Sequence, residues 1–534
     1  MNRRNFLGAG RSRGRAAYSD RGRSQAPPIF AKRTAAGLEP YAGPWTYKEA
    51  AHLLRRCMIG PTDAEIRAAV TDGLDATVAK LLQGFAPPMD LIQDWAGSDP
   101  QIRADATGYE AWQLELFRRR ETLMRWWPRV IATSPVSMQE WLVLFWHGHF
   151  TSEMQVVNFA EWMFGQNQLF RQNILGNFKQ LAKDVTKDMA MLVYLDGIKN
   201  FKSGQRNNIN ENYARELMEL FTCGVVDWDG NPNYTETDIS EAARALSGWG
   251  GTPSSKGAYY AGLTSAFVPG RWDNGQKTVM GRAGNWNADD VVDIIFEQRA
   301  DQTSKYICEK LYRALIYDVA DRDVATGMAE TLRTAGWEMR PVMEQLLKSA
   351  HFYDDTNIGA IQRSPAQYLI AMVRGMNLQS IPDFNPAQSG RGSQDLVGRM
   401  GTLGMTLFDP PDVKGWRAGR TWVSTSTVPV RQKFAIDVAK GVIRVRGTTL
   451  YTLNAIEFAK SFPDYNDIRK LNANMAQYLL NTQPSDDEKQ MLLDTLLAGG
   501  VNYEWDIDDP NQKADERIRK FLEAAAQLAK FQLY

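Results

Sequence analysis

From Tyr47 onward, apolar residues recur at intervals of three and four positions along most of the chain. This spacing places the apolar side chains on one face of an α-helix. Long stretches in which apolar and polar residues alternate, as they do in half-buried strands, are scarce. The pattern therefore predicts an all-α protein.

Helix start and stop signals agree with this pattern. Thr62-Asp-Ala-Glu65 has the form of a capping box, and Gly60-Pro61 just before it ends a helix over residues 47–58. Capping residues also stand before expected helices at three further positions: Ser137, Thr235 and Asn287. We expect about fifteen to eighteen helices in total.

One segment favours strands. In residues 266–280, Trp272-Asp-Asn-Gly275 predicts a hairpin turn, because Asn-Gly readily adopts positive φ. We expect one large helical domain over residues 45–440 that carries this small hairpin. A C-terminal helical segment, residues 441–534, follows, and its last helix, over 511–533, should pack its apolar face on the body.

The chain has 534 residues, 62 basic and 62 acidic, but residues 1–33 hold nine Arg or Lys against the single acid Asp20. We interpret residues 1–44 as a basic, disordered tail. The remaining chain is acidic overall, which argues against nucleic acid as the partner. The densest apolar run, residues 141–146, falls far short of the roughly 20 residues that span a bilayer, so no transmembrane helix is expected.

Five motifs together carry a family resemblance: Leu54–Pro61, Phe145–Phe150 (FWHGHF), Asn210–Gly224, Tyr234–Trp249 and Phe408–Trp416. In this order and spacing they resemble the bacterial family named "domain of unknown function 1800". The resemblance covers about residues 47–440. It implies a large, mostly helical fold, an export signal, and a neighbouring exported partner protein with a sulfatase-like fold. It implies no particular reaction, and Trp272-Asp273 departs from the His-Asp pair found in many members.

The N-terminus resembles a twin-arginine export signal at Asn2–Leu7. The apolar helix that should follow is absent, because five arginines occupy its place. We interpret the motif as a relic. Export to the periplasm or cell envelope and retention in the cytoplasm both stay open.

His147-Gly148-His149 is the strongest candidate metal site. Imidazoles bind zinc and other divalent transition metals, with a carboxylate such as Glu216 as a further ligand. Residues two apart point about 200° from each other in a helix, so the helix would have to end near Gly148 for both rings to face one ion. The alternative is that the two histidines cap or pack within an aromatic cluster.

The helix over residues 210–224 carries candidate catalytic residues. Glu216 and Glu219 share a face, and two carboxylates there repel unless a positive group or a metal lies between them. The alternative is an ion-pair ladder in which Arg215 joins Glu211 to Glu219.

Asp238 begins a similar acidic and basic series on the next helix, where Arg244 could pair with Glu216 or Glu219. Asp238 and Arg215 are further candidate catalytic residues, and the alternative is that they form a polar seam that holds the helices together.

A proline-rich loop offers candidate ligand-binding residues. Asp409-Pro-Pro-Asp412 restricts the backbone and would present Lys414, Trp416 and Trp422 at fixed positions, suited to stacking on a sugar. The alternative is that the tryptophans fill the core.

No phosphate-binding loop, dinucleotide fingerprint, zinc-protease motif, nucleophile elbow or calcium loop is present in the sequence, so no nucleotide cofactor is expected. Two hypotheses remain. The first is a metal-dependent, hydrolytic enzyme acting on a cell-envelope polymer, and the second is a non-enzymatic helical scaffold or partner protein.

Overall fold

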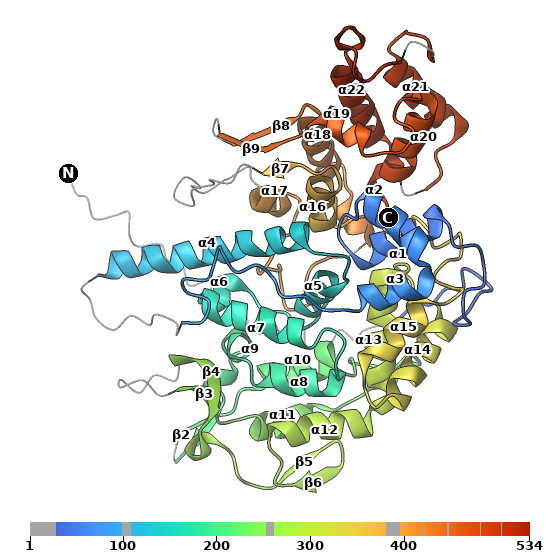
Figure 1. Ribbon diagram of the computed structural model, residues 1–534. Helices are drawn as coiled ribbons and strands as arrows, with labels where there is room; N and C mark the ends of the chain where they lie inside the picture. Colours follow the sequence, from blue (N-terminus) through green and yellow to red (C-terminus); the bar gives the residue numbers. More distant parts are fainter. Residues whose placement is uncertain are drawn as a thin grey trace.

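A computed structural model shows helices α1 to α22 as the main elements, which confirms the predicted mostly helical class (Figure 1). The structure describes residues 28–534 except 99–107, 205, 253–260, 381–395, 418, 446–447, 481 and 503–504. The twin-arginine-like motif at Asn2–Leu7 lies outside the described residues.

The first half of the chain forms helices that stack across the body of the molecule. They are α1 (Tyr47–Cys57), α2 (Asp63–Asp72), α3 (Leu74–Leu81), α4 (Tyr109–Thr133), α5 (Gln139–His149), α6 (Met154–Val157), α7 (Ala160–Gln172), α8 (Phe178–Thr186), α9 (Met189–Tyr194), α10 (Asn212–Glu216), the π-helix η2 (Leu217–Phe221) and α11 (Glu236–Ala245). The short 3₁₀ helix η1 (Gly197–Lys199) follows α9.

The second half continues this packing and then forms a group of helices at one end of the molecule (Figure 1). The elements are η3 (Pro269–Arg271), α12 (Ala288–Gln298), α13 (Ala300–Leu315), α14 (Arg322–Thr334), α15 (Met339–Leu347), α16 (Pro365–Gly375), α17 (Leu396–Thr402), η5 (Gly419–Trp422), α18 (Thr427–Ala439), α19 (Ala455–Lys460), α20 (Ile468–Leu479), α21 (Asp486–Leu497), η7 (Pro510–Gln512), α22 (Ala514–Gln527) and η8 (Ala529–Gln532).

Most predicted caps occur as expected. Thr62 accepts from the Glu65 amide, while the Glu65 side chain accepts from the Thr62 amide, and Thr235 and Asn287 begin equivalent boxes. Ser137 differs slightly, since α5 starts two residues later. Its hydroxyl still accepts from the Gln139 amide.

The strands are more numerous than the single predicted hairpin. Four small antiparallel sheets join β1 (Phe201–Ser203) to β2 (Arg206–Asn208), β3 (Trp249–Thr252) to β4 (Ala261–Phe267), β5 (Lys277–Val279) to β6 (Arg282–Gly284), and β9 (Thr448–Thr452) to both β7 (Gln379–Ser380) and β8 (Val442–Val445).

The predicted hairpin turn at Trp272–Gly275 was wrong. The turn between β5 and β6 is Met280-Gly281, and both residues have positive φ, as a tight two-residue hairpin requires. Residues 272–275 form a loop instead, in which the Asp273 carboxylate accepts from the Gly275 amide.

Residues 28–44 were predicted to belong to the disordered tail, but they lie against the body of the molecule. Phe30 contacts the ring of Trp228, and the backbone of Tyr41 donates to the Lys348 carbonyl at 2.8 Å. His351 also contacts this segment, because its Nδ1 lies 2.9 Å from the Ala36 carbonyl. The stretch after Pro28 is therefore part of the folded surface.

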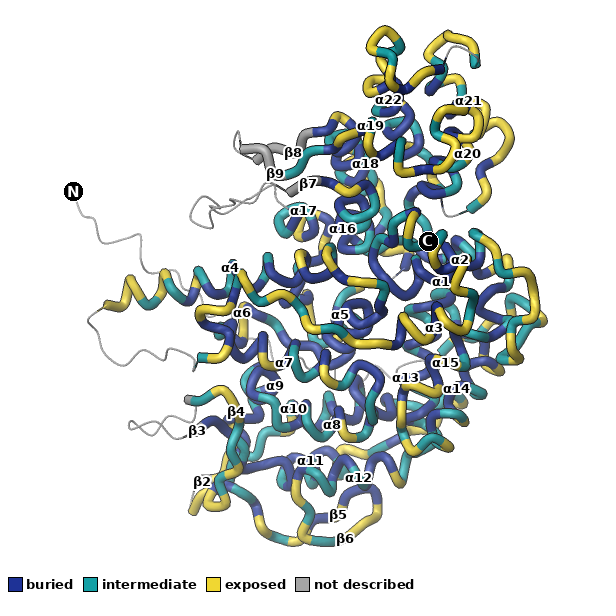
Figure 2. The backbone as a smooth tube through the Cα atoms, in the orientation of Figure 1, coloured by how far each residue is buried: buried dark blue, intermediate teal, exposed yellow. Residues whose placement is uncertain are grey.

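Among the described residues, a connected set of buried apolar side chains runs from Ala50 to Phe531 and includes Ile518 and Phe521 on the apolar face of α22. Figure 2 shows buried positions both in α22 and through the body of the molecule. The last helix thus packs on the rest of the chain as its sequence predicted. Within the described ranges, none of the helices has the length and apolar character needed to cross a membrane.

Candidate functional site

Three of the motifs meet at the end of α5. The loop that carries Gly415 and Trp416 lies directly on Gly148, where a Cβ on Gly415 would collide with the Gly148 carbonyl. Gly415 also has a φ of +84°, so both the contact and the backbone conformation require glycine. On the other side of the α5 end, His149 contacts the π-helix η2. The fold therefore brings FWHGHF, the glutamate helix and the proline-rich loop together.

His149 is fully buried and uses both ring nitrogens. Its Nε2 lies 3.1 Å from the Phe221 carbonyl and its Nδ1 lies 3.0 Å from Lys310 Nζ. Because a carbonyl only accepts, Nε2 carries the proton and Nδ1 accepts from the lysine. Burial, assisted by Lys310, holds the His149 pKa well below its ordinary value. The ring is therefore a neutral link between α5, η2 and α13.

His149 and Lys310 lie at the end of η2, where backbone carbonyls need hydrogen-bond donors. A helix leaves its last carbonyls without backbone donors, and here side chains supply them. The donors are Thr222 to Leu217, Lys310 to Leu220, His149 to Phe221, and Asn233 to Cys223 and Gly224. His149 and Lys310 thus cap the end of η2, and capping is the alternative role that the sequence left open for the histidine.

His147 occupies a different environment. Its ring is surrounded by Trp127, Phe170, Phe408 and Trp416, with ring centroids 5.2–6.1 Å away. Among the described residues, neither ring nitrogen has a hydrogen-bond partner. Burial lowers its pKa to about 3, so the ring is neutral.

The two histidines do not face one ion. The helix α5 continues through His149, so the rings point to opposite sides, as helical geometry dictates for residues two apart. Across the part of the chain that the structure describes, no group of three or more His, Cys, Asp or Glu side chains is arranged to hold a metal ion.

Glu216 and Glu219 lie on the turn where α10 becomes η2, and both are partly exposed. Burial, together with the neighbouring Glu219, raises the pKa of Glu216 to about 7, whereas Arg215 and Lys414 oppose the shift. A carboxyl group with this pKa holds a proton near neutral pH. Insertions of a π-turn into helices are often found at functional sites.

Two tyrosines border Glu219. The pKa values of Tyr234 and Tyr306 are raised chiefly by burial, and the charge of Glu219 adds to both shifts. Tyr306 also lies beneath Lys310, whose Nζ is 4.9 Å from its ring centroid. Burial lowers the pKa of Lys310 to about 8. The carboxylates therefore share their surroundings with tyrosine hydroxyls and a lysine of unusually low basicity.

Arg215 is engaged elsewhere. It makes a two-pronged ion pair with Glu236, at 2.9 and 2.7 Å, and a longer one with Glu211 at 3.6 Å. The predicted ladder is thus present toward Glu211, but the main partner of the arginine comes from α11.

Asp238 and Arg244 both make contacts that join α11 to neighbouring segments. Asp238 caps α11 through Thr235 and accepts from the Met280 amide at 2.6 Å. The predicted ion pair of Arg244 with Glu216 or Glu219 does not form. Arg244 binds Glu241 and Asp273 instead, which joins α11 to the loop before β5. The Arg244 and Lys202 cations hold the pKa of Asp273 below its usual range.

The proline-rich loop presents only part of the predicted surface. Lys414 is exposed and acts electrostatically on Glu216. Trp416 is partly buried against His147, and its Nε1 donates to the Thr406 carbonyl at 3.1 Å. Trp422 is 5% exposed and lies in the core, so its ring does not form a stacking surface.

Sequence reasoning missed Lys310, Tyr234 and Tyr306 as members of this cluster. Lys310 lies on α13, far along the chain from both His149 and Leu220. No local spacing connects them, and only the packing of α13 against η2 reveals the contact.

The fold and this site define a large helical protein with a half-buried carboxylate pair beside a π-helix whose end is capped by side chains. A family model described as "protein of unknown function (DUF1800)" matches residues 52–532, and the chain belongs to this family. The match confirms the resemblance carried by the five motifs. No curated protein and no solved structure matches the chain.

Proposed function

We propose that the protein is a hydrolytic enzyme that acts on a cell-envelope polymer, with Glu216 as general acid and Glu219 as its carboxylate partner. The observation that supports this most is the pKa of Glu216, raised to about 7 by burial and by Glu219. Pairs of carboxyl groups in unlike environments are the usual acid and base of hydrolases that cleave C–O bonds.

In this mechanism, protonated Glu216 donates its proton to the oxygen that leaves the polymer. Ionised Glu219 takes a proton from the attacking water, whose hydroxyl adds to the other side of the broken bond. When the products leave, Glu219 releases its proton and Glu216 regains one, so the net reaction consumes one water. Exposed Lys414 lies where it can bind an acidic group of the substrate.

In this proposal a divalent transition metal, with zinc as the first candidate, would bind at the two carboxylates and not at the histidines. His149 already uses both ring nitrogens, whereas Glu216 makes no hydrogen bond to a described residue. Elemental analysis of wild type and of a Glu216→Gln variant tests this role. Stoichiometric metal that is lost in the variant supports it.

A non-enzymatic scaffold, or a partner of a sulfatase-like exported protein, is the second candidate. The observation in its favour is that His149, Lys310 and Asn233 all hold helices together through backbone carbonyls. Under this alternative, substitution of Glu216 changes stability alone.

The activity test uses soluble products released from peptidoglycan and other envelope polymers. Glu216→Gln removes the proton donor, so the rate of release is expected to fall about 10²–10⁴-fold. Wild-type activity should decline as pH rises above about 7, because Glu216 then loses its proton. Glu297→Gln, which removes an exposed carboxylate paired with Arg282, is the control. Equal rates in the three proteins, or release by none, would favour the scaffold.

The raised pKa can also be tested without a substrate. Between pH 4.5 and about 7 the folded chain holds a proton on Glu216 that the unfolded chain has lost. The contribution of this group is therefore fully present below pH 4.5 and is lost as pH rises through about 7. Relative to wild type, Glu216→Gln should gain about 1–2 kcal/mol between pH 5 and pH 8, a value that allows for solvent at this half-buried group. Urea denaturation at both pH values measures the difference, and parallel pH profiles would contradict it.

A further inference from the structure

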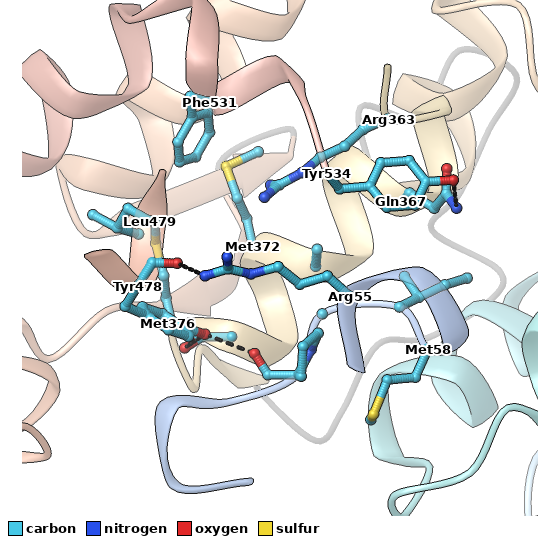
Figure 3. Close-up of a pocket in the computed structure, with 15 residues that line it drawn as sticks. Arg55, Met58, Arg363, Gln367, Met372, Met376, Tyr478, Leu479, Phe531 and Tyr534 are labelled. Atoms are coloured by element: carbon cyan, nitrogen blue, oxygen red, sulfur yellow. Dashed lines mark hydrogen bonds between the residues drawn. The ribbon is translucent and has the colours of Figure 1, made fainter. Parts of the chain in front are cut away.

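A cavity of about 50 Å³ lies between α1, α16, α20 and the residues that follow α22 (Figure 3). Its walls include Arg55 from α1, Arg363 just before α16, Met372 from α16, Tyr478 from α20, and Tyr534. It is separate from the Glu216 cluster and shares no residue with it. An inference drawn from it is therefore independent of the hydrolytic proposal.

Two arginines bring unpaired donors to this cavity. Arg55 uses only Nη2, which donates to the carbonyls of Gln477 and Tyr478 at 3.3 and 2.6 Å. Arg363 uses only Nε, which donates to the Leu533 carbonyl at 3.1 Å. The other guanidinium N–H groups of both residues donate to no described residue. Figure 3 shows the two guanidinium groups directed into the same space, next to Met372.

The acids whose charge reaches these arginines, Asp63 at Arg55 and Asp318 at Arg56, lie outside the lining of the cavity. No aspartate or glutamate is among the cavity's lining residues. Two further arginines, Arg56 and Arg431, are fully buried nearby and each has an unpartnered Nε among the described residues. Burial, together with repulsion from Arg55 and Arg431, lowers the pKa of Arg363 to about 10. Buried cations are normally paired, but no described carboxylate forms an ion pair with buried Arg56 and Arg431 or with the partly exposed Arg55 and Arg363.

The remaining walls are mostly apolar. Met58, Met376, Leu479 and Phe531 surround the guanidinium groups. The Tyr478 hydroxyl donates to the carbonyls of Pro61 and Gly375, whereas the Tyr534 hydroxyl accepts from Gln367 and keeps its own hydrogen as a further donor. The free polar capacity of the cavity is thus almost entirely that of arginine donors, which match the two oxygens of a carboxylate or phosphate.

We propose that this cavity binds a small anion, a carboxylate or phosphate group with at most a short apolar remainder, through Arg55 and Arg363. A volume of about 50 Å³ holds roughly three to five water-sized probes, which limits the occupant to a few heavy atoms. The anion would neutralise the guanidinium cluster and join α1 to the C-terminal helices.

Isothermal titration calorimetry of the full chain with inorganic phosphate, acetate and butyrate, at ionic strength fixed with sodium chloride, tests the site. We expect saturable binding of one anion per chain, with a dissociation constant of about 1 mM or lower. Tighter binding of butyrate than acetate identifies an apolar remainder, and preference for phosphate identifies an oxyanion site. Absence of saturable binding by all three anions to the wild-type protein overturns the proposal, whatever the variants do.

Arg363→Gln should weaken binding at least tenfold, because it removes the charge and one planar fork of donors. Arg517→Gln is the matched control. Arg517 is buried and donates to two carbonyls, those of Leu496 and Leu497, but it lines no part of this cavity. Binding that survives Arg363→Gln, or that is lost equally in Arg517→Gln, overturns the assignment.

Discussion

Replacing Glu140 by alanine is expected to lower the free energy of unfolding by about 3–5 kcal/mol, because it leaves a buried arginine without its counter-charge. Glu140 accepts from Arg171 Nε and Nη2 at 3.0 and 2.8 Å and from Trp127 Nε1 at 2.9 Å. The side chains of both ion-pair partners are at most 5% exposed. After the substitution, the Arg171 guanidinium keeps its hydrogen bond to Asn167 and its contact with the Trp126 ring, but no described carboxylate pairs with it. Urea or thermal denaturation measures the loss.

Two controls separate this effect from a general one. Glu121→Ala breaks a more exposed pair with Arg125 on α4 and should cost less than about 1 kcal/mol. Replacing Glu140 by leucine together with Arg171 by methionine removes both charges and should cost less than Glu140→Ala alone. If the double variant is the least stable of the three, the ion pair stabilises the fold directly and the argument from an unpaired buried charge fails.

His149→Ala is expected to destabilise the protein by about 2–4 kcal/mol, whereas His147→Phe is expected to stabilise it by about 1 kcal/mol. His149 supplies a donor to Phe221 and an acceptor to Lys310, and alanine leaves both without it. His147 has two buried ring nitrogens without a partner among the described residues, so phenylalanine removes polar atoms and keeps the aromatic packing.

Denaturation of the two variants, with elemental analysis of each, measures this contrast. The opposite signs are the important part, because a shared metal site would make both substitutions harmful. A stoichiometric metal that is lost in His147→Phe would show that His147 is a ligand and would place the metal site in the FWHGHF motif.

The local features of the fold could be predicted from the sequence. Each capping box depends on residues three positions apart, as at Thr62 and Glu65, so the signal and the structure lie in the same short segment. The final helix was predictable for the same reason, because its apolar face follows from local spacing. Phe521, on that face, is buried in α22.

The candidate site could be predicted only in part. Glu216 and Glu219 are one helical turn apart, so their shared face follows from spacing alone. The directions in which the two histidine rings point could not be predicted without knowing where α5 ends. The role of His149 could not be predicted because its partner Lys310 comes from a distant helix. The partner of Arg215 is Glu236, on another element, which helical spacing cannot reveal.

The hairpin shows how side-chain packing overrides a turn signal. Asn-Gly favours a tight turn in isolation, but Asp273 in the same loop is held by Arg244 and Lys202. These contacts fix residues 272–275 as a loop beside α11, and the turn moves to Met280-Gly281. The arginine cavity was equally hidden, because its members come from segments hundreds of residues apart, such as Arg55 and Tyr478.

The final residues of this sequence lie against one of its first helices. Tyr534 stacks on Arg56 of α1, and its backbone pairs with Ile361, which precedes α16. During synthesis, α1 leaves the ribosome long before Ile361 and Tyr534 have been added to the chain. Arg56 therefore stays exposed to water until these residues follow. Such non-local closure slows folding and leaves an incomplete chain with exposed surface that chaperones recognise.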